Sequence, residues 1–499
     1  MSLASQIAAP RASHQPPRVA IIGAGVAGLC TGIQLKKAGI GQFTIFEKSD
    51  DVGGTWRDNS YPGCACDVPS HLYSYSFGIN TAWSHKYSPQ PEILQYLEHC
   101  TDKFGLRPHI KTNTAIASAR FDTTSGTWKL KTDKGEDFEA EILVSGVGQL
   151  NRPAIPAFTG LTDFAGRTFH SARWDHSADI AGKRVAVVGN GASAVQFIPQ
   201  IAPKVGQLTV FQRSANWIVP RNDYAYPKWA REMFREMPFL SRVYRSYLYW
   251  MLEKNFMAFI KDHWFGKLFD KAARDHLAAQ VPDAALRAKL TPDYTIGCKR
   301  ILIADDFLPV FSRSNVELVT DGIARFTAGG IETQDGKARD FDVVIFATGF
   351  ETTSFLAPID IRGLNGRALA DAWRGGPEAY MGVTVPAFPN FFLLYGPNTN
   401  LGHNSIIFMI EAQVRYVLEC IKEMVNRDLA YLDVKPQALA VFTARVQSEL
   451  TKRVWAAGCS SWYKTASGHI TNNWSGPTIK YWQMLRRPDF SAYDAQARV

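Results

Sequence analysis

The stretch Arg18-Val-Ala-Ile-Ile22, followed by Gly23-Ala-Gly25-Val-Ala-Gly28, decides the fold of this chain. Its first five residues form a short β-branched run, which predicts a buried strand. The glycines permit a tight turn, and the residues after them have the apolar spacing of a helix that closes on Gly39. The next apolar run, Phe43-Thr-Ile-Phe46, ends at Glu47. Strand, turn, helix and strand together predict a βαβ unit that binds a dinucleotide.

The same pattern occurs a second time further along the chain. Arg184-Val-Ala-Val-Val188 leads into Gly189-Asn-Gly191-Ala-Ser-Ala194, and an expected helix through Ile201 precedes an apolar run that ends in Gln212-Arg213-Ser214. Ala194 replaces the third glycine and still permits close packing of helix against strand. The sequence therefore predicts two nucleotide-binding units in one chain.

The residues at the ends of the second strands predict which nucleotide each unit binds. Glycine loops bring backbone N–H groups close to a pyrophosphate at a helix N-terminus. We expect Glu47 to accept hydrogen bonds from a ribose diol, whereas Arg213, at the corresponding position, would pair with a 2′-phosphate. FAD is therefore expected in the first unit, and NADPH rather than NADH in the second. The expected binding residues include Gly23, Gly25, Gly28, Glu47, Gly189, Gly191, Ala194 and Arg213.

The length of 499 residues is several times that of one typical domain, so more than one domain is expected. The strand-like segment 143–148 and the proline-rich residues after it look like an exit from the first unit, and 342–350 looks like the return crossing. We expect an α/β fold with two Rossmann-like dinucleotide-binding domains, the NADP domain inserted in the FAD domain, and a helical insertion. The expected parts are a flexible N-terminal tail (1–17), an FAD-binding domain (18–148 and 342–499), an NADP-binding domain (149–220 and 296–341) and the helical insertion (221–295).

Composition disfavours several other classes of protein. The formal net charge is +9, but Lys and Arg are scattered, so a nucleic-acid partner is not expected. The uncharged stretch 379–410 is broken by prolines and asparagines, which argues against stable membrane insertion. The histidines are dispersed without zinc spacing, so no metal is expected. Seven irregularly spaced cysteines and a start without a signal peptide favour a reducing, cytoplasmic location.

Two further motifs identify the chemistry. They are Gly53-Gly-Thr-Trp56-Arg-Asp-Asn-Ser-Tyr61-Pro62-Gly63-Cys-Ala-Cys-Asp67 and Phe164-Ala-Gly166-Arg-Thr-Phe-His170-Ser-Ala-Arg-Trp174-Asp175. Position for position, they match the fingerprints [A/G]GxWxxxx[F/Y]P[G/M]xxxD and FxGxxxHxxxW[P/D]. The chain thus resembles the type I Baeyer–Villiger monooxygenases, which are class B flavoprotein monooxygenases, from Arg18 to about Arg487. The resemblance implies an FAD-containing, NADPH- and O₂-dependent enzyme that converts ketones to esters or lactones through a C4a-peroxyflavin.

The resemblance also implies roles for individual residues. In Gly297-Cys-Lys299-Arg300, Arg300 looks like the catalytic arginine that stabilises the negatively charged peroxyflavin. A permanently charged, forked donor suits that role. Asp67 would pair with Arg300 and set its position, and Lys299 would join Arg213 at the 2′-phosphate.

Other family positions are expected to contact the cofactors or to support movement. His170 is expected to serve interdomain movement rather than to act as a general base. The residues that resemble family positions are Thr55, Trp56, Arg57, Asp58 and Tyr73 for FAD, Ser193, Ser214 and Trp462 for NADPH, and His170 and Trp174 for a conformational role.

Alternatives remain open at this point. The related flavin monooxygenases oxygenate nitrogen or sulfur in small molecules, and a flavin-binding redox sensor would perform no catalysis. A disulfide reductase is disfavoured because Cys64 and Cys66 form CxC rather than CxxC. The aromatic-rich segment 243–260 fits a core or pocket wall better than a membrane dock, and 396–405 is expected either beside the flavin or on the surface. The segment 460–476 resembles family members that act on aryl and acyclic ketones.

Overall fold

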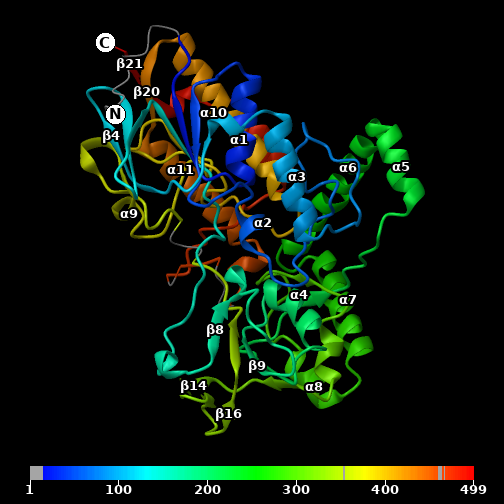
Figure 1. The fold of residues 1–499 in the computed structure, drawn as a ribbon. Helices are drawn as coiled ribbons and strands as arrows, with labels where there is room; N and C mark the ends of the chain where they lie inside the picture. The colour runs from blue at the N-terminus through cyan, green and yellow to red at the C-terminus, as the bar shows by residue number, and fades with distance from the viewer. Residues whose placement is uncertain (1–14, 352–354, 459–462, 466, 499) are drawn as a thin grey trace.

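Two five-stranded parallel sheets organise the computed structural model, which describes residues 15–351, 355–458, 463–465 and 467–498 (Figure 1). The first sheet has the order β19-β7-β1-β2-β3 and the second the order β13-β10-β9-β17-β8. The first comprises β1 (Val19–Ile22), β2 (Phe43–Phe46), β3 (Ile110–Lys111), β7 (Ile142–Ser145) and β19 (Phe391–Leu393). The second comprises β8 (Arg167–His170), β9 (Arg184–Val188), β10 (Gln207–Phe211), β13 (Val316–Val319) and β17 (Val343–Phe346).

In each sheet the central strand is the one that leads into a glycine loop. β1 lies between β2 and β7, and β9 lies in the same way between β10 and β17. All residues of β1 and β7 are buried, as expected for central strands of a parallel sheet. The loops lead into α1 (Val26–Lys37) and α4 (Ala192–Ile201). The two predicted βαβ units are therefore present. The two sheets differ in one edge strand, because β8 precedes β9 in the chain whereas β19 follows β1.

Residues 342–350 were predicted to return the chain to the FAD-binding domain. This assignment is wrong for the strand within them, β17, which belongs to the second sheet. β17 pairs in parallel with β9 and β8 of the second sheet, so the chain leaves that sheet only after Phe346, not at residue 342. β19 completes the first sheet by pairing with β7. β7 and β17 are both short, fully buried apolar strands, and such a strand carries no mark of the sheet it joins.

Smaller sheets surround the two large ones, and most of their strand pairs are antiparallel, except β11 with β12 and β18 with β4. β4 (Ile116–Asp122), β5 (Thr127–Thr132) and β6 (Asp137–Ala140) form a meander that β18 (Asp360–Arg362) extends. β14 (Ile323–Phe326), β15 (Gly330–Thr333) and β16 (Ala338–Asp340) form a second one. Two further pairs are β11 (Ile218–Val219) with β12 (Leu302–Ile303), and β20 (Leu429–Val434) with β21 (Tyr493–Ala497).

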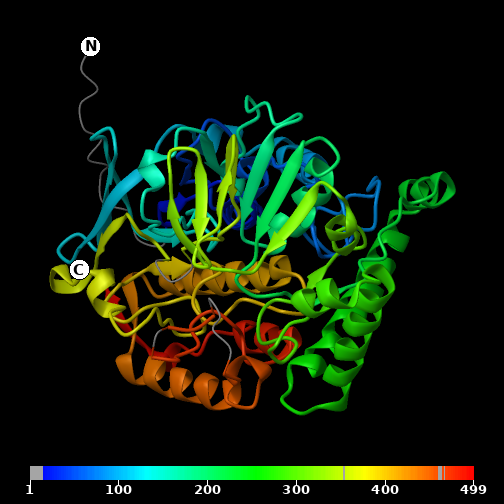
Figure 2. The ribbon, with the colours of Figure 1, turned by 90° about the horizontal axis from the view of Figure 1, so that it is seen from below.

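Helices cover the sheets and form one side of the molecule. α10 (Ile406–Asn426) packs against α1 in the first unit. α5 (Lys228–Glu236), α6 (Pro238–Glu253), α7 (Trp264–Gln280) and α8 (Ala284–Leu290), green in Figure 2, follow one another along one edge of the molecule. In the part of the chain that is described, no helix combines the length and apolar character that a bilayer crossing requires. The remaining helices are α2 (Thr55–Asp58), α3 (Gln90–Lys103), α9 (Leu369–Ala372), α11 (Pro436–Leu450) and α12 (Thr478–Leu485).

Two segments connect the sheets and lie side by side. We call residues 148–154 and 347–351 the crossing ribbon, because backbone hydrogen bonds join them. Ala154 N donates to Gly349 O at 2.9 Å, and Glu351 N donates to Arg152 O at 3.0 Å. The chain therefore passes between the two units through a two-stranded connection.

Candidate functional site

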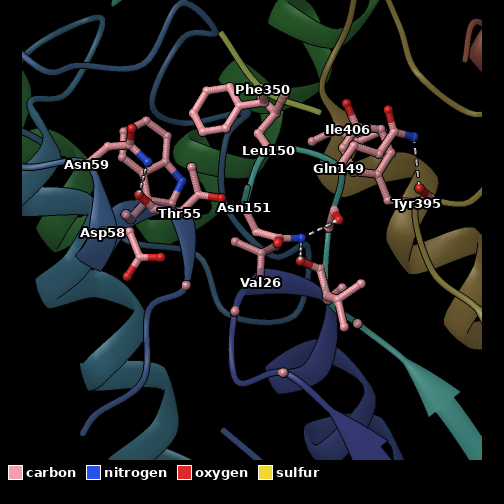
Figure 3. A pocket seen from close by; sticks show the side chains of 18 of the residues that line it. Val26, Thr55, Asp58, Asn59, Gln149, Leu150, Asn151, Phe350, Tyr395 and Ile406 are labelled. Atoms are coloured by element: carbon pink, nitrogen blue, oxygen red, sulfur yellow. Dashed lines mark hydrogen bonds between the residues drawn. The ribbon is translucent and has the colours of Figure 1, made fainter. Parts of the chain in front are cut away.

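A cavity of about 500 Å³ extends from the first glycine loop to the crossing ribbon. Its wall includes residues from both nucleotide units, among them Glu47 at the end of β2 and Ser193 at the start of α4. Figure 3 shows Thr55 and Asp58 on one side of this cavity, Asn151 of the crossing ribbon at its centre, and Tyr395 on the other side. The candidate site thus lies where the two units meet.

The first glycine loop is built for close approach of a ligand. Gly23 has φ +98°, and a Cβ atom on Gly28 would lie 1.8 Å from Gly23 O, so neither position accepts a side chain. Gly25 caps α1 without a side-chain hydrogen bond, which leaves the first N–H groups of the helix available. Gly23 and Gly25 line the cavity, whereas Gly28 packs behind them. These features suit a pyrophosphate at the helix N-terminus.

Glu47 closes this loop from the end of β2. Its carboxylate is buried and accepts hydrogen bonds from Ala24 N at 2.8 Å and from Ser49 N at 3.0 Å. These contacts hold the carboxylate in place on the wall of the cavity. A carboxylate has about four acceptor positions, so Glu47 retains capacity for a ribose diol.

The residues of the first fingerprint line the cavity beside Glu47. Trp56 Nε1 donates to Tyr73 Oη at 3.1 Å, and Arg57 Nη2 lies 2.7 Å from Asp58 Oδ1. Arg57 is also 3.9 Å from the Glu47 carboxylate. The structure therefore brings the expected FAD residues together, namely Thr55, Trp56, Arg57, Asp58, Asp67 and Tyr73, all of which line the cavity.

Arg300 and Asp67 form an ion pair on the same wall. Arg300 Nη2 donates to Asp67 Oδ2, and the two side chains retain 38% and 32% of their exposure. The charge of Asp67 raises the pKa of Arg300 above its ordinary value. Arg300 is thus a cation held in place by Asp67, the last residue of the first fingerprint, although the two residues are far apart in the sequence.

Cys64 and Cys66, which precede Asp67 in the first fingerprint, are free, buried thiols. Burial raises the pKa of Cys64 to about 12 and that of Cys66 well above its ordinary value. Because the thiolate is the reactive form, these residues do not fit the redox pair of a disulfide reductase.

The second glycine loop has the same construction as the first. Gly189 has φ +103°, and a Cβ atom there would lie 2.5 Å from Ala347 O. Gly191 caps α4 without a side-chain hydrogen bond, and a Cβ atom on it would meet nothing within 4 Å, so the approach is open. Ala194 is fully buried against the strand, and Ser193 lines the cavity.

Three predicted NADPH residues meet beside this loop. Lys299 Nζ donates to Ser214 Oγ at 2.9 Å and lies 4.4 Å from the centre of the Tyr294 ring. Burial, with the nearby charge of Arg213, lowers the pKa of Lys299. Arg213 and Lys299 are thus two cations close enough to disfavour each other's charge, as a site for an anion requires, and their role in binding NADPH stays a prediction. Trp462 lies outside the described residues.

His170 and Trp174 lie outside the cavity wall as it is described. Burial lowers the pKa of His170 to about 4, and its Nδ1 accepts a hydrogen bond from Ala172 N at 3.1 Å. The ring also makes an edge contact with Phe350 of the crossing ribbon at 5.9 Å. Trp174 packs on Phe197 of α4 at 5.2 Å. From these positions His170 and Trp174 could support the connection between the two units. Their conformational role stays a prediction.

The sequence left open whether residues 396–405 lie beside the flavin or on the surface, and in the structure this segment and Tyr395 form a wall of the cavity. Tyr395, Asn400 and Asn404 line it, and most of this segment is buried, so the surface-loop alternative is wrong. Asn398 Nδ2 donates to Ile470 O at 2.8 Å, and Asn400 Nδ2 donates to Asn473 Oδ1 at 2.7 Å. In the sequence, only the high density of Asn, Pro and Gly marked this segment. The hydrogen-bond partners of its asparagines lie some seventy residues away, so they could not be recognised locally.

Two side chains, Gln196 and Arg173, make non-covalent contacts between the units that were not predicted from the sequence. Gln196 of α4 accepts from Tyr61 Oη at 3.0 Å and donates to Ala65 O at 3.0 Å. Arg173, which follows β8, lies 3.2 Å from Asp58 Oδ2. Each contact ties the second unit to the first fingerprint. Neither residue belongs to a glycine loop, so local pattern gave no indication of these contacts.

A buried carboxylate joins the helical edge to the cavity wall. Glu253, the last residue of α6, accepts from Asn404 Nδ2 at 2.7 Å, Thr478 Oγ1 at 2.7 Å and Ile479 N at 3.0 Å. Burial raises its pKa, but the His403 ring 3.5 Å away and the hydrogen bonds from Thr478 and Ile479 outweigh burial and bring the pKa to about 2. Glu253 is therefore an ionised anchor for Asn404 and for the start of α12.

Comparison with known proteins agrees with this geometry. Residues 16–359 match the model of the flavin-binding monooxygenase-like family. A Baeyer–Villiger monooxygenase of Pseudomonas aeruginosa is 43% identical over 494 residues, which is 99% of this chain and 94% of the relative. A Baeyer–Villiger monooxygenase of Streptomyces coelicolor is 42% identical and covers 96% of this chain and 93% of its own length.

A solved structure has the same fold over nearly the whole chain. Cyclohexanone monooxygenase from Rhodococcus sp. Phi1, bound to NADP+, is 29% identical with a TM-score of 0.86, and the match covers 97% of this chain and 100% of that one. The chain therefore belongs to the flavin-binding monooxygenase-like family, among its Baeyer–Villiger monooxygenases.

Proposed function

We propose that this chain is an FAD-containing, NADPH- and O₂-dependent Baeyer–Villiger monooxygenase that converts ketones to esters or lactones. The observation that carries the proposal is the Arg300–Asp67 pair on the wall of the cavity that begins at the first glycine loop. FAD, when bound, supplies the redox chemistry by taking a hydride from NADPH and activating O₂. The protein supplies binding, orientation and charge.

The residues present fit both cofactors. Gly25 leaves the N-terminus of α1 uncapped for the FAD pyrophosphate, and the fixed Glu47 carboxylate suits the ribose diol. Gly191 does the same at α4 for NADPH, and Arg213 with Lys299 would hold its 2′-phosphate. The first sheet is thus assigned to FAD and the second to NADPH.

Arg300 stabilises negative charge in this arrangement. Its guanidinium is always protonated, and Asp67 fixes one edge of the fork. Among the described residues no other partner occupies the remaining N–H groups, which can therefore donate to a ligand. Such donors stabilise an anionic oxygen in the cavity, including the oxyanion that develops on a ketone under attack. Asp67 acts through Arg300 and is a positioning residue.

A product assay with variants tests this function. The holoenzyme, supplied with NADPH and air, is given matched panels of aryl, acyclic and cyclic ketones and of thioethers, and mass spectrometry detects esters or sulfoxides. We expect esters from the native enzyme and a loss of about 10²- to 10³-fold in kcat for Arg300→Ala. Arg313→Ala, at an exposed position, is the matched control.

Two results would contradict the proposal. Ester formation at the native rate by Arg300→Ala would remove the role of the cation. Sulfoxides without any ester from the native enzyme would favour the nitrogen- and sulfur-oxygenating class instead.

A further inference from the structure

Exposed large hydrophobic side chains gather on one part of this molecule. Among the residues that the structure describes, eleven such side chains are exposed, and nine of them lie between residues 224 and 268. The five most exposed aromatic side chains among them are Trp229, Phe239, Tyr247, Trp250 and Trp264, which are 58–67% exposed. They belong to α5, α6 and α7, which lie along one edge of the molecule in both ribbon views (Figures 1 and 2). We call this surface the aromatic edge.

α6 shows how the aromatic edge is built. Phe239, Val243, Tyr247 and Trp250 recur at helical spacing and therefore share one face. The opposite face is buried, and there Leu248 and Tyr249 join a hydrophobic cluster with Leu72. α6 thus has two apolar faces, one buried against the protein and one turned outward.

Arg245 holds α6 firmly in this orientation. Its Nη1 donates to the carbonyl oxygens of His71 at 3.1 Å, Leu72 at 2.8 Å and Ser74 at 2.9 Å. Three backbone acceptors on one cation fix the rotation of the helix. The outer aromatic face is therefore presented by a rigid support.

The charge around these side chains is positive. Within 224–268, seven Lys or Arg side chains are exposed against three Asp or Glu. From Met237 to Leu252 there is no acidic residue at all. The basic residues are Lys228, Arg231, Arg235, Arg242, Lys254, Lys261 and Lys267, and the acidic ones are Glu232, Glu236 and Asp262.

We propose that the aromatic edge docks on the surface of an anionic lipid bilayer. Aromatic rings flanked by basic side chains suit the headgroup region, where apolar burial and attraction to anionic lipid act together. A second copy of this chain is a poorer occupant, because it would place the same excess of positive charge opposite itself. The docking is peripheral, and it is independent of the chemistry proposed for the cavity.

Vesicle co-sedimentation of the full-length holoenzyme tests the docking. The vesicles are phosphatidylcholine alone or with about 30% phosphatidylglycerol, at low salt and at about 1 M NaCl. We expect binding only to the anionic vesicles, and loss of most of it at high salt. Sedimentation equilibrium without lipid, run in parallel, reports any dimer.

Three variants separate apolar from electrostatic contributions. Phe239→Ser/Tyr247→Ser/Trp250→Ser should weaken vesicle binding at least about tenfold, because it removes apolar area from the headgroup region. Lys228→Gln/Arg231→Gln/Arg242→Gln should weaken binding about fivefold for each charge removed. Ile155→Ser/Val441→Ser, at the two exposed positions away from the edge, should bind as the native protein does.

The outcomes decide whether an anionic bilayer or a second copy of this chain covers the aromatic edge. Unchanged vesicle binding by the triple serine variant, or no preference for anionic vesicles, would overturn the proposal. So would a dimer of the native protein that the serine substitutions dissociate, because a second copy would then cover the edge. FAD content and helical circular dichroism equal to those of the native protein show that each variant is folded.

Discussion

Acidification should release α5 and α6 from the body of the protein through His71. This side chain is 1% exposed, and neither ring nitrogen has a hydrogen-bond partner in the part of the chain that is described. Three rings surround it, Tyr226, Phe234 and Tyr244, and all come from the segment that contains α5 and α6. Burial, with the nearby charge of Arg245, lowers the pKa of His71 to about 4.

The pKa shift sets the magnitude and the direction of the effect. When the segment opens, His71 regains its ordinary pKa of 6.5, so the open form binds the proton more tightly than the closed form. The contribution of neutral His71 to the stability of the closed form is therefore fully present above pH 6.5, and it is lost as the pH falls toward 4. At about pH 5 the loss is about 2 kcal/mol, a factor of about thirty in the opening equilibrium.

Hydrogen exchange read by mass spectrometry measures this opening directly. After correction for intrinsic exchange rates, opening of 228–253 should rise about thirtyfold between about pH 7.5 and about pH 5 in the native protein. His71→Phe keeps a ring in the aromatic cage and cannot take up the proton, so its exchange should change only slightly. His99→Gln, at an exposed position, should behave as the native protein does.

The comparison with His71→Phe is the decisive one. His170 also has a lowered pKa of about 4, and its protonation affects both proteins equally. A thirtyfold rise that persists in His71→Phe would refute the reasoning, as would a native segment whose opening does not depend on pH.

Two further predictions concern cofactor binding. Lys299→Ala should raise the KM for NADPH at least about tenfold, since one cation at the 2′-phosphate is lost, and should leave the KM for NADH unchanged; steady-state kinetics with both nucleotides check this, and an equal rise for both would contradict it. Glu253→Gln should remove about 3 kcal/mol of stabilisation at neutral pH, from a pKa of about 2 against the ordinary 4.5, and loosen Asn404 on the cavity wall. The stabilisation by ionised Glu253 is fully present above pH 4.5 and is lost as the pH falls toward 2. The temperature at which FAD is released should therefore differ less between the variant and the native protein at acidic pH than at neutral pH. Glu232→Gln, exposed on α5, is the control, and release temperatures equal to the native value would contradict the anchoring role.

The local parts of the site could be predicted from the sequence. A glycine loop, its strand and its helix are contiguous, so the first loop from Gly23 and the second from Gly189 were found with their second strands. The residues at the ends of those strands, Glu47 and Arg213, were found for the same reason. The Arg300–Asp67 pair joins residues 233 positions apart, and only resemblance to a family pointed to it.

The remainder depends on long-range packing. The sheet joined by β17 was predicted wrongly, because a short buried strand fits either sheet equally well. The wall at 395–405 was ambiguous because Asn398 is satisfied by the distant Ile470 and Asn473. The aromatic helix α6 was expected to be core or pocket wall, but its composition does not reveal that only one of its two apolar faces finds a partner.

The crossing ribbon has a mechanical consequence for turnover. A single linker would let two bodies rotate freely about it, but two hydrogen-bonded strands restrict that rotation and leave bending out of their common plane as the easier movement. The nucleotide bodies should therefore approach and part along one arc. A hydride donor carried on one body would then return to the same place over its acceptor in each cycle.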